Sequence, residues 1–592
     1  MSLPPVSPNV LAEAVDALPA RLRKRLDEVV DQARGWPVES TPDGVVVTVD
    51  DQRVRLAARV LSADDAVCSC LLAPRCLHRT ALLAAAPVLP AEPDAAAPPA
   101  VASASPASLG SSLLDLPPST SRPSTEGERG QGPGWDEASL TAAAALWRAA
   151  TPLLETGIPG AGAVAQAQLL RAVHEARGAG LPRAAAAGVR VVEGLRLART
   201  GEARFRLADL TDDLRELLTV CHQITGGRGD PTQVRGVSRR EYESVGSQRL
   251  WGLFTEPVLT ASGYAGAATY LSDEDGRLWT ISDVRPGGLA DAREAADGPV
   301  TLGEVRLSHR EAGRAGFVVT GARAAANGRL SAGASVQAVR TAGRGWTEEP
   351  LARHWDTPLA EQVARYRDSL VGPAPIRPAG YDLVFLQGTV RTSHSGLALD
   401  VPDVGAVEVL APVTDPGLPA VANLRQLTRA AAGQPARLIG RFAGTRAVHG
   451  LALAAPWLPD RLDGHVDLSV DVLQRSDLPG STDPSPVEAT APDVGTPDSL
   501  QLLRLRVERA VSGGRAAVRT PSAGEAVRLA AAHLPYGATV LTGLQEAADR
   551  RTRDRFGRLD QLDSDRLARA WLAAAVYCGA AQRHLATAGW LA

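Results

Sequence analysis

The chain has 592 residues, which predicts about four domains. Its 63 basic and 66 acidic side chains give a formal net charge of −3, which argues against a protein that coats nucleic acid through charge over its whole surface. Lys24 is the only lysine, and it stands in a basic helical run. P-loop ATPases and protein kinases need a lysine on their phosphates, so both classes are excluded.

The cellular compartment follows from cysteine content and hydropathy. Five cysteines in a chain of this length do not form a disulfide framework. The apolar stretch Ala570–Ala581 is too short to span a membrane. The N-terminus lacks the basic start and apolar block of a signal peptide. We therefore expect a cytoplasmic protein without membrane contact.

The first predicted unit covers residues 1–90. A helix is expected over Pro19–Arg34 because its apolar residues recur on one face. A β-hairpin is expected over 45–67, and a helix over Cys76–Ala86 is ended by proline. Together these elements predict a small ββα module at about 40–90, tethered to a larger body.

The remaining chain divides by composition and hydrophobic period. We expect a disordered Pro/Ala/Ser-rich linker at 91–134, a helical region at 135–226, a β-rich region with one helix at 227–378, a β-barrel-like region at 379–476, a second linker at 477–497 and a helical C-terminal region at 498–592. The predicted fold class is therefore α+β and multidomain.

The barrel-like region has an informative order of elements. Three strands are predicted between Asp382 and Leu410, a helix over Val421–Ala431, and two strands between Ala436 and Ala454. Three strands, a helix and two strands is the order of an OB-type barrel. Other small β barrels and α+β sheets share this order, so an OB-type barrel is one of several folds that it predicts.

One cysteine and histidine cluster carries metal chemistry. Cys68 and Cys70 are two residues apart, so on a strand their side chains would point to one face. A turn at Pro74 would return Cys76 and His78 opposite them. Three thiols and one imidazole complete a tetrahedral Zn²⁺ shell with no position left for water, which favours one structural zinc over a catalytic one.

Two other interpretations of the cluster fit the sequence less well. Ordinary buried thiols would not gather three of five cysteines in one short loop with a histidine in register. Iron–sulfur ligation is disfavoured by the histidine and by the tight spacing.

The motif resembles a known family. Cys-x-Cys, a short spacer and Cys-x-His, after a β-hairpin and before a helix, resemble the SWIM zinc finger, which implies zinc ligation by Cys68, Cys70, Cys76 and His78. The wider chain, especially Tyr264–Val284, is similar to the large actinobacterial SWIM-finger proteins. Such proteins tend to be encoded near AAA+ ATPases of the MoxR type and von Willebrand factor A proteins, so the resemblance implies partners of these kinds.

The family is described as binding DNA or proteins, and the finger surface favours proteins here. Leu71 and Leu72 stand where many members have basic residues, and the nearby Arg75 and Arg79 are offset by acidic residues. We therefore expect a non-enzymatic, zinc-binding adaptor that engages protein partners through the finger and the β-rich body. The alternative is a DNA- or RNA-binding protein that uses the finger and the OB-like barrel.

Other residues give weaker signals, and no catalytic or cofactor-binding residue is predicted. Cys221 and His222 are adjacent on a predicted helix, where their side chains diverge, so a half-buried thiol beside a surface histidine is expected. Cys578 is expected in a core. Aromatic residues of the β-rich sequence could stack bases, but core packing is expected for Trp251, Trp279 and Tyr264.

Overall fold

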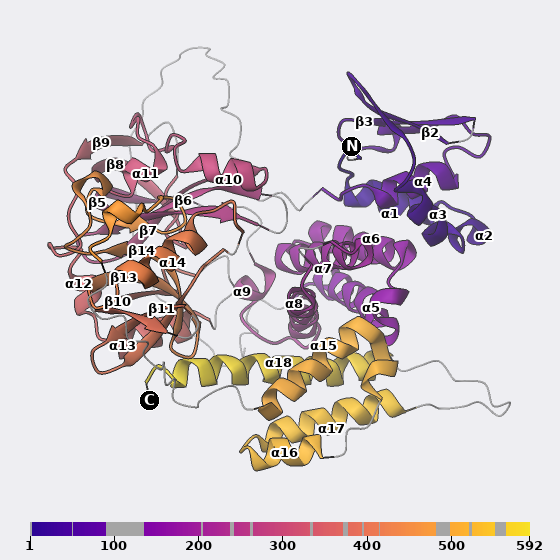
Figure 1. Ribbon diagram of the computed structural model, residues 1–592. Coiled ribbons are helices and arrows are strands. Elements are labelled where there is room, and N and C mark those ends of the chain that lie inside the picture. Colours follow the sequence, from indigo (N-terminus) through magenta and orange to yellow (C-terminus); the bar gives the residue numbers. More distant parts are fainter. Residues whose placement is uncertain are drawn as a thin grey trace, which may run out of the picture.

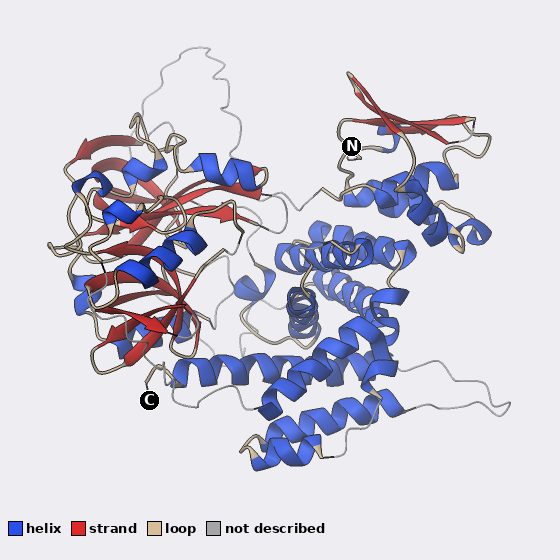
Figure 2. Cartoon of the chain, viewed as in Figure 1, coloured by secondary structure: helices blue, strands red, loops and turns tan. Residues whose placement is uncertain are grey.

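The computed structural model describes most of the chain as a mixed α+β, multidomain fold, as predicted (Figures 1 and 2). The described residues are 3–49, 51–89, 135–202, 205–236, 242–260, 264–331, 336–370, 377–393, 396–413, 415–480, 498–519, 524–550 and 564–591. The predicted linker at 91–134, and most of the one at 477–497, lie outside these ranges. Across the described ranges, none of the helices has both the length and the apolar character needed to cross a bilayer.

The N-terminal unit contains the predicted hairpin and helix. Antiparallel pairing places Val47 opposite Val54 and Val54 also opposite Cys68. The single helix predicted over Pro19–Arg34 is instead two short helices, and an edge strand precedes the hairpin. The elements are α1 (Pro8–Asp16), α2 (Ala20–Arg23), α3 (Leu26–Ala33), β1 (Val38–Thr41), β2 (Gly44–Val49), β3 (Gln52–Ala57), β4 (Ala66–Cys68) and α4 (Leu77–Ala85).

The N-terminal unit is docked on the body as well as joined to it by the chain. Helix α1 packs against α4 on one side and against α6 (Ala163–Gly178) on the other, and one apolar core joins the two units (Figure 1). Asp27 accepts a hydrogen bond from the Ala163 amide at 2.6 Å, and the Arg196 guanidinium donates to the Ala86 carbonyl at 2.7 Å. The prediction of a module that is only tethered to the body is therefore wrong. Helix α1 has apolar residues on two faces, and it buries one against α4 and the other against α6.

Two helical units pack against each other, the first near the centre of the view in Figure 1 and the second below it. The predicted helical regions at 135–226 and 498–592 are both confirmed as helical. The first unit consists of α5 (Glu137–Gly160), α6, α7 (Pro182–Thr200) and α8 (Leu207–Thr225), followed by the short α9 (Pro231–Arg235). The second consists of α15 (Asp498–Val518), α16 (Glu525–Ala531), α17 (Pro535–Asp549) and α18 (Ser564–Ala588).

These two units repeat one arrangement, which the sequence reasoning missed. Helix α5 is kinked at Gly157 (φ 66°, ψ −171°) and α15 at Gly514 (φ 69°, ψ −164°). The same spacing along the chain separates Gly157 from Gly514 and the buried Cys221 from the buried Cys578. A Cβ on Gly157 would lie 2.6 Å from the Gly514 nitrogen, and one on Gly514 would lie 2.7 Å from the Gly157 nitrogen. The contact is reciprocal: each glycine lies against the backbone of the other, as expected for two similar units related by an approximate twofold axis.

A five-stranded antiparallel sheet forms the next unit, in the order β7-β6-β5-β8-β9. The sequence predicts a hairpin over Tyr264–Val284 with a turn at 272–276, and this hairpin is confirmed, with Tyr264 opposite Pro286. The sequence predicts one helix over Pro350–Leu370, but the structure has two helices that are separated before Pro358, because proline disfavours a helical residue before it. The elements are β5 (Tyr242–Leu259), β6 (Tyr264–Asp273), β7 (Leu278–Pro286), α10 (Leu289–Ala295), α11 (His309–Ala312), β8 (Gly316–Ala325), β9 (Gln337–Thr341), α12 (Arg353–Asp356) and α13 (Leu359–Ser369).

The barrel region has the predicted order of three strands, a helix and two strands. The parallel pairing of Glu408 with Ala447 joins β12 to β14 and closes the sheet, as in an OB-type barrel. A short sixth strand was not predicted. The elements are β10 (Leu383–Ser393), β11 (Gly396–Val401), β12 (Gly405–Leu410), α14 (Ala420–Ala430), β13 (Pro435–Gly444), β14 (Ala447–Ala454) and β15 (Val466–Asp467).

Buried ion pairs join the sheet unit to the barrel. Arg314, which follows α11, pairs with Asp467 at 3.3 Å and with Asp471 at 2.8 Å, and neither carboxylate is exposed by more than 7%. Arg310 also pairs with Asp471. A cavity of about 690 Å³ opens beside this network. Removing one partner from such a network would leave a buried charge uncompensated.

Candidate metal centre

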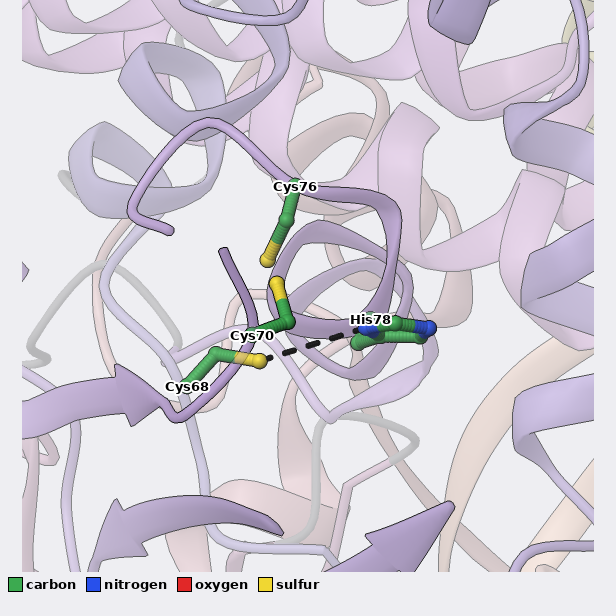
Figure 3. Close-up of side chains that lie close together, drawn as sticks. All are labelled: Cys68, Cys70, Cys76 and His78. Carbon is green, nitrogen blue, oxygen red and sulfur yellow. Dashed lines mark hydrogen bonds between the residues drawn. The ribbon is translucent and has the colours of Figure 1, made fainter. Parts of the chain in front are cut away.

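The structure brings the four predicted ligand residues together. The ligand atoms of Cys68, Cys70, Cys76 and His78 all lie within 4.8 Å of one another (Figure 3). Figure 3 shows the Cys70 and Cys76 sulfurs facing each other, with the Cys68 sulfur directed towards the His78 ring at 4.0 Å from Nδ1. Three thiols and an imidazole at this spacing form a group that could hold one metal ion.

Each ligand is positioned by a different part of one short segment. Strand β4 ends at Cys68, and a turn over 71–74 reverses the chain. Cys76 is the N-cap of α4, and His78 lies in the first turn of that helix. Cys70 lies after the end of the strand, so the expectation that strand alternation aligns it with Cys68 is wrong; the turn brings it into place.

The protein environment keeps two of the thiols protonated in the absence of a metal. Burial raises the pKa of Cys68, and it raises the pKa of Cys76 to about 12. The pKa of Cys70 is lowered, because hydrogen bonds from Cys76 and from the Leu72 amide outweigh the effect of its burial. A metal ion binds the thiolate, so its binding must release protons and must be weakened by acid.

A buried arginine, Arg79, holds the segments around the site together through hydrogen bonds to backbone carbonyl groups. Arg79 donates from Nε to the Ala66 carbonyl at 2.7 Å and from Nη2 to the Ala63 carbonyl at 3.0 Å. Its Nη1 lies 3.5 Å from the Pro74 carbonyl. The side chain thus ties α4 to the chain before β4 and to the ligand turn. The sequence predicts an exposed charge at Arg79. Its acceptors are backbone carbonyl groups, which no sequence pattern identifies, so its burial could not be predicted.

The ligand turn presents an apolar surface. Leu71 is fully exposed and Leu72 is 57% exposed, and both lie between the two halves of the ligand motif. Val67, on β4, and Leu61, farther towards the N-terminus, are about half exposed. Exposed apolar side chains, as expected from the sequence, are therefore present at the tip of the finger.

The other sequence candidates lie apart from this site. Cys221 is fully buried, and burial raises its pKa to about 12, whereas a half-buried thiol was expected. Cys578 is buried, as predicted. Trp251 and Trp279 are in cores, as predicted, at 4% and 1% exposure. Within the described ranges, the cluster at Cys68–His78 is the one group of this kind found for a metal ion.

Comparisons with known proteins do not place the chain in a family. No family model matches it, and neither a curated protein nor a solved structure matches it significantly. The geometry of the cluster and its surroundings therefore carries the functional interpretation.

Proposed function

We propose that Cys68, Cys70, Cys76 and His78 hold one structural Zn²⁺ in a SWIM-type finger. The observation that carries this proposal is the convergence of the four ligand atoms within 4.8 Å. Three thiolates and an imidazole are a donor set that suits zinc, and four protein ligands leave no open position for a substrate. The hairpin before the cluster and the helix after it are the flanking elements of such a finger.

The protein as a whole is proposed to be a non-enzymatic, cytoplasmic adaptor. Leu71 and Leu72 are exposed beside the ligands, and apolar side chains at the tip of a rigid loop suit a protein partner better than a phosphate backbone. The family resemblance suggests the partner, an AAA+ ATPase of the MoxR type or a von Willebrand factor A protein. Docking of the N-terminal unit on α6 would hold the finger tip in a fixed place on the body.

Binding of DNA or RNA is the second candidate, and the closed barrel favours it. OB-type barrels bind oligonucleotides across their second and third strands and beside the loop between their last two strands. Here that loop, Gly444–Ala447, is contacted by the C-terminal end of the chain. Trp590 Nε1 donates to the Gly444 carbonyl at 2.7 Å, and Gly589 packs on Thr445. Part of the surface that this function would use is therefore occupied, which is why the adaptor is preferred.

The metal is tested by elemental analysis of freshly purified protein. We expect one zinc per chain, and we expect Cys76→Ser to lose it. Cys221→Ala is the matched control, since it removes a buried thiol far from the cluster and should retain the metal. Wild-type protein without zinc, or full zinc content in Cys76→Ser, would overturn the proposed finger.

The partner is tested with purified components. A MoxR-type ATPase or von Willebrand factor A protein from the same genome should bind the full-length chain, and the double variant Leu71→Ser, Leu72→Ser should weaken binding at least tenfold. Val527→Ser, on α16, is the control because it changes an equally exposed apolar side chain elsewhere. Tight DNA or RNA binding that falls steeply with salt would favour the second candidate instead.

A further inference from the structure

A cavity of about 220 Å³ lies where α8, α15 and α18 meet. Three arginines line it, one from each helix: Arg215, Arg504 and Arg583. Two of them converge on Gly579, where the helix has no side chain. A Cβ on that glycine would collide with Arg215 Nη1 and lie 3.3 Å from Arg583 Nη1. The bare glycine therefore gives two guanidinium groups room to lie side by side.

The charges in this cavity are incompletely balanced. Arg215 pairs with Asp212 at 3.1 Å, and Arg504 pairs with Glu508 at 2.8 Å. Arg583 forms no ion pair with any described residue, although it lies next to Arg215. Burial lowers the pKa of Arg583, and the Arg215 charge lowers it further, although Tyr366 and Asp212 act in the opposite direction. The guanidinium groups of Arg215 and Arg583 thus share one nearby carboxylate, that of Asp212, which leaves an excess positive charge that favours a bound anion between them.

The repeat of the helical units provides an internal comparison. The two units can be aligned so that Gly157 matches Gly514 and Cys221 matches Cys578. In this alignment, each arginine of the cavity, and Gly579, corresponds to a different residue type in the other unit. Trp147 replaces Arg504, Leu572 of the opposite unit replaces Arg215, His222 replaces Gly579 and Gly226 replaces Arg583.

The counterpart position is filled by protein. The Trp147 indole is mostly buried there, lies 6.2 Å from the His222 ring and donates from Nε1 to Asp565 at 2.6 Å. The Arg569 guanidinium lies over the Trp147 ring, 5.5 Å from its centroid. The Trp147 ring thus fills the position that corresponds to the cavity. At the other position, between α8, α15 and α18, the cavity is open and lined by three arginines.

We infer that the cavity between α8, α15 and α18 binds an oxyanion of the phosphate class, held by Arg215 and Arg583 over Gly579. Guanidinium groups match the oxygens of phosphate and donate more than one hydrogen bond to them. A volume of about 220 Å³ suits a phosphate group with a small substituent and is below the range of drug-sized ligand pockets. The ligand is therefore either free phosphate or the phosphate group of a small phosphorylated molecule.

Calorimetric titration of the full-length protein tests this site, with inorganic phosphate and glycerol phosphate as separate probes and sodium chloride at matched ionic strength as the blank. We expect saturable binding of at least one probe, and Arg583→Ala should weaken it at least tenfold. Tighter binding of glycerol phosphate would identify a phosphorylated molecule as the ligand, and equal or tighter binding of inorganic phosphate would identify free phosphate.

Two further variants keep the test decisive. Arg569→Ala removes an exposed arginine of α18 at the counterpart position and should leave phosphate binding unchanged. Gly579→Ala should weaken binding, because the new methyl group displaces the Arg215 guanidinium. The inference is overturned if neither probe binds above the chloride blank, or if Arg583→Ala binds phosphate as tightly as the wild type and Arg569→Ala do.

Discussion

The N-terminal unit (residues 3–89) and the β body, which comprises the five-stranded sheet unit and the barrel (residues 242–480), hold their buried polar groups in different ways. In the N-terminal unit, four ligand residues come from one short segment and converge through a single turn. In the β body, Arg314 meets Asp467 and Asp471 across the junction of the five-stranded sheet and the barrel. A local cluster can be recognised from sequence spacing, whereas a charge network between distant segments cannot. The two regions should therefore lose stability for different reasons: the N-terminal unit when the metal is removed, and the β body when a buried charge loses its partner. Four predictions test this difference.

The largest effect is expected from Cys76→Ser. Structural zinc contributes roughly 10–16 kcal/mol in finger peptides, so its loss should unfold the small sheet and α4. Hydrogen exchange should show fast exchange in β2, β3 and α4 and unchanged protection in α15–α18. The α1–α6 contact makes α6 the element of the body that responds most. Unchanged exchange in α4 would contradict a metal-held unit.

The second effect tests the β body through Arg314→Met. This change leaves Asp467 and Asp471 buried with one cation fewer, and it should destabilise the body by about 3–5 kcal/mol in urea unfolding. Arg344→Met is the control, because its pair with Glu348 is exposed and should contribute less than about 1 kcal/mol. Similar losses in the two variants would mean that burial does not distinguish these pairs.

The third prediction concerns pH and again separates the two regions. Burial lowers the pKa of His354 to about 4, and its Nε2 lies 2.9 Å from the Ser272 hydroxyl. The unfolded chain gains this proton near pH 6.5, so stability is complete above that pH and falls by about 3 kcal/mol as pH drops towards 4.

The pH effect is measured as the urea midpoint of the β body between pH 7 and pH 4. His354→Gln should flatten this profile, whereas His174→Gln, on the exposed face of α6, should not. A profile as steep in His354→Gln as in the wild type would assign the acid sensitivity to other groups.

The smallest effect on stability is expected from the double variant Leu71→Ser, Leu72→Ser. Both side chains are exposed, so the free energy of unfolding should change by less than about 0.5 kcal/mol. Thermal unfolding of the zinc-loaded protein measures this change. A larger loss would mean that the finger tip packs on the rest of the chain and is unavailable to a partner.

The sequence by itself determined the local features of this protein. It placed the ligands Cys68, Cys70, Cys76 and His78, the hairpin before them and the helix after them, because neighbouring residues and turn signals specify these features. It also gave the order of strands and helix in the barrel, since each element has its own hydrophobic period. The tertiary structure showed the parallel pairing of β12 with β14.

Only the tertiary structure decided how distant segments meet. The docking of α1 on α6, the burial of Arg79 on three carbonyl groups and the contact of Gly157 with Gly514 all depend on packing between separated elements. The convergence of Arg215 and Arg583 on Gly579 is of the same kind. Such contacts are made by backbone atoms and helix faces whose partners lie far along the chain, so no local pattern of residues encodes them.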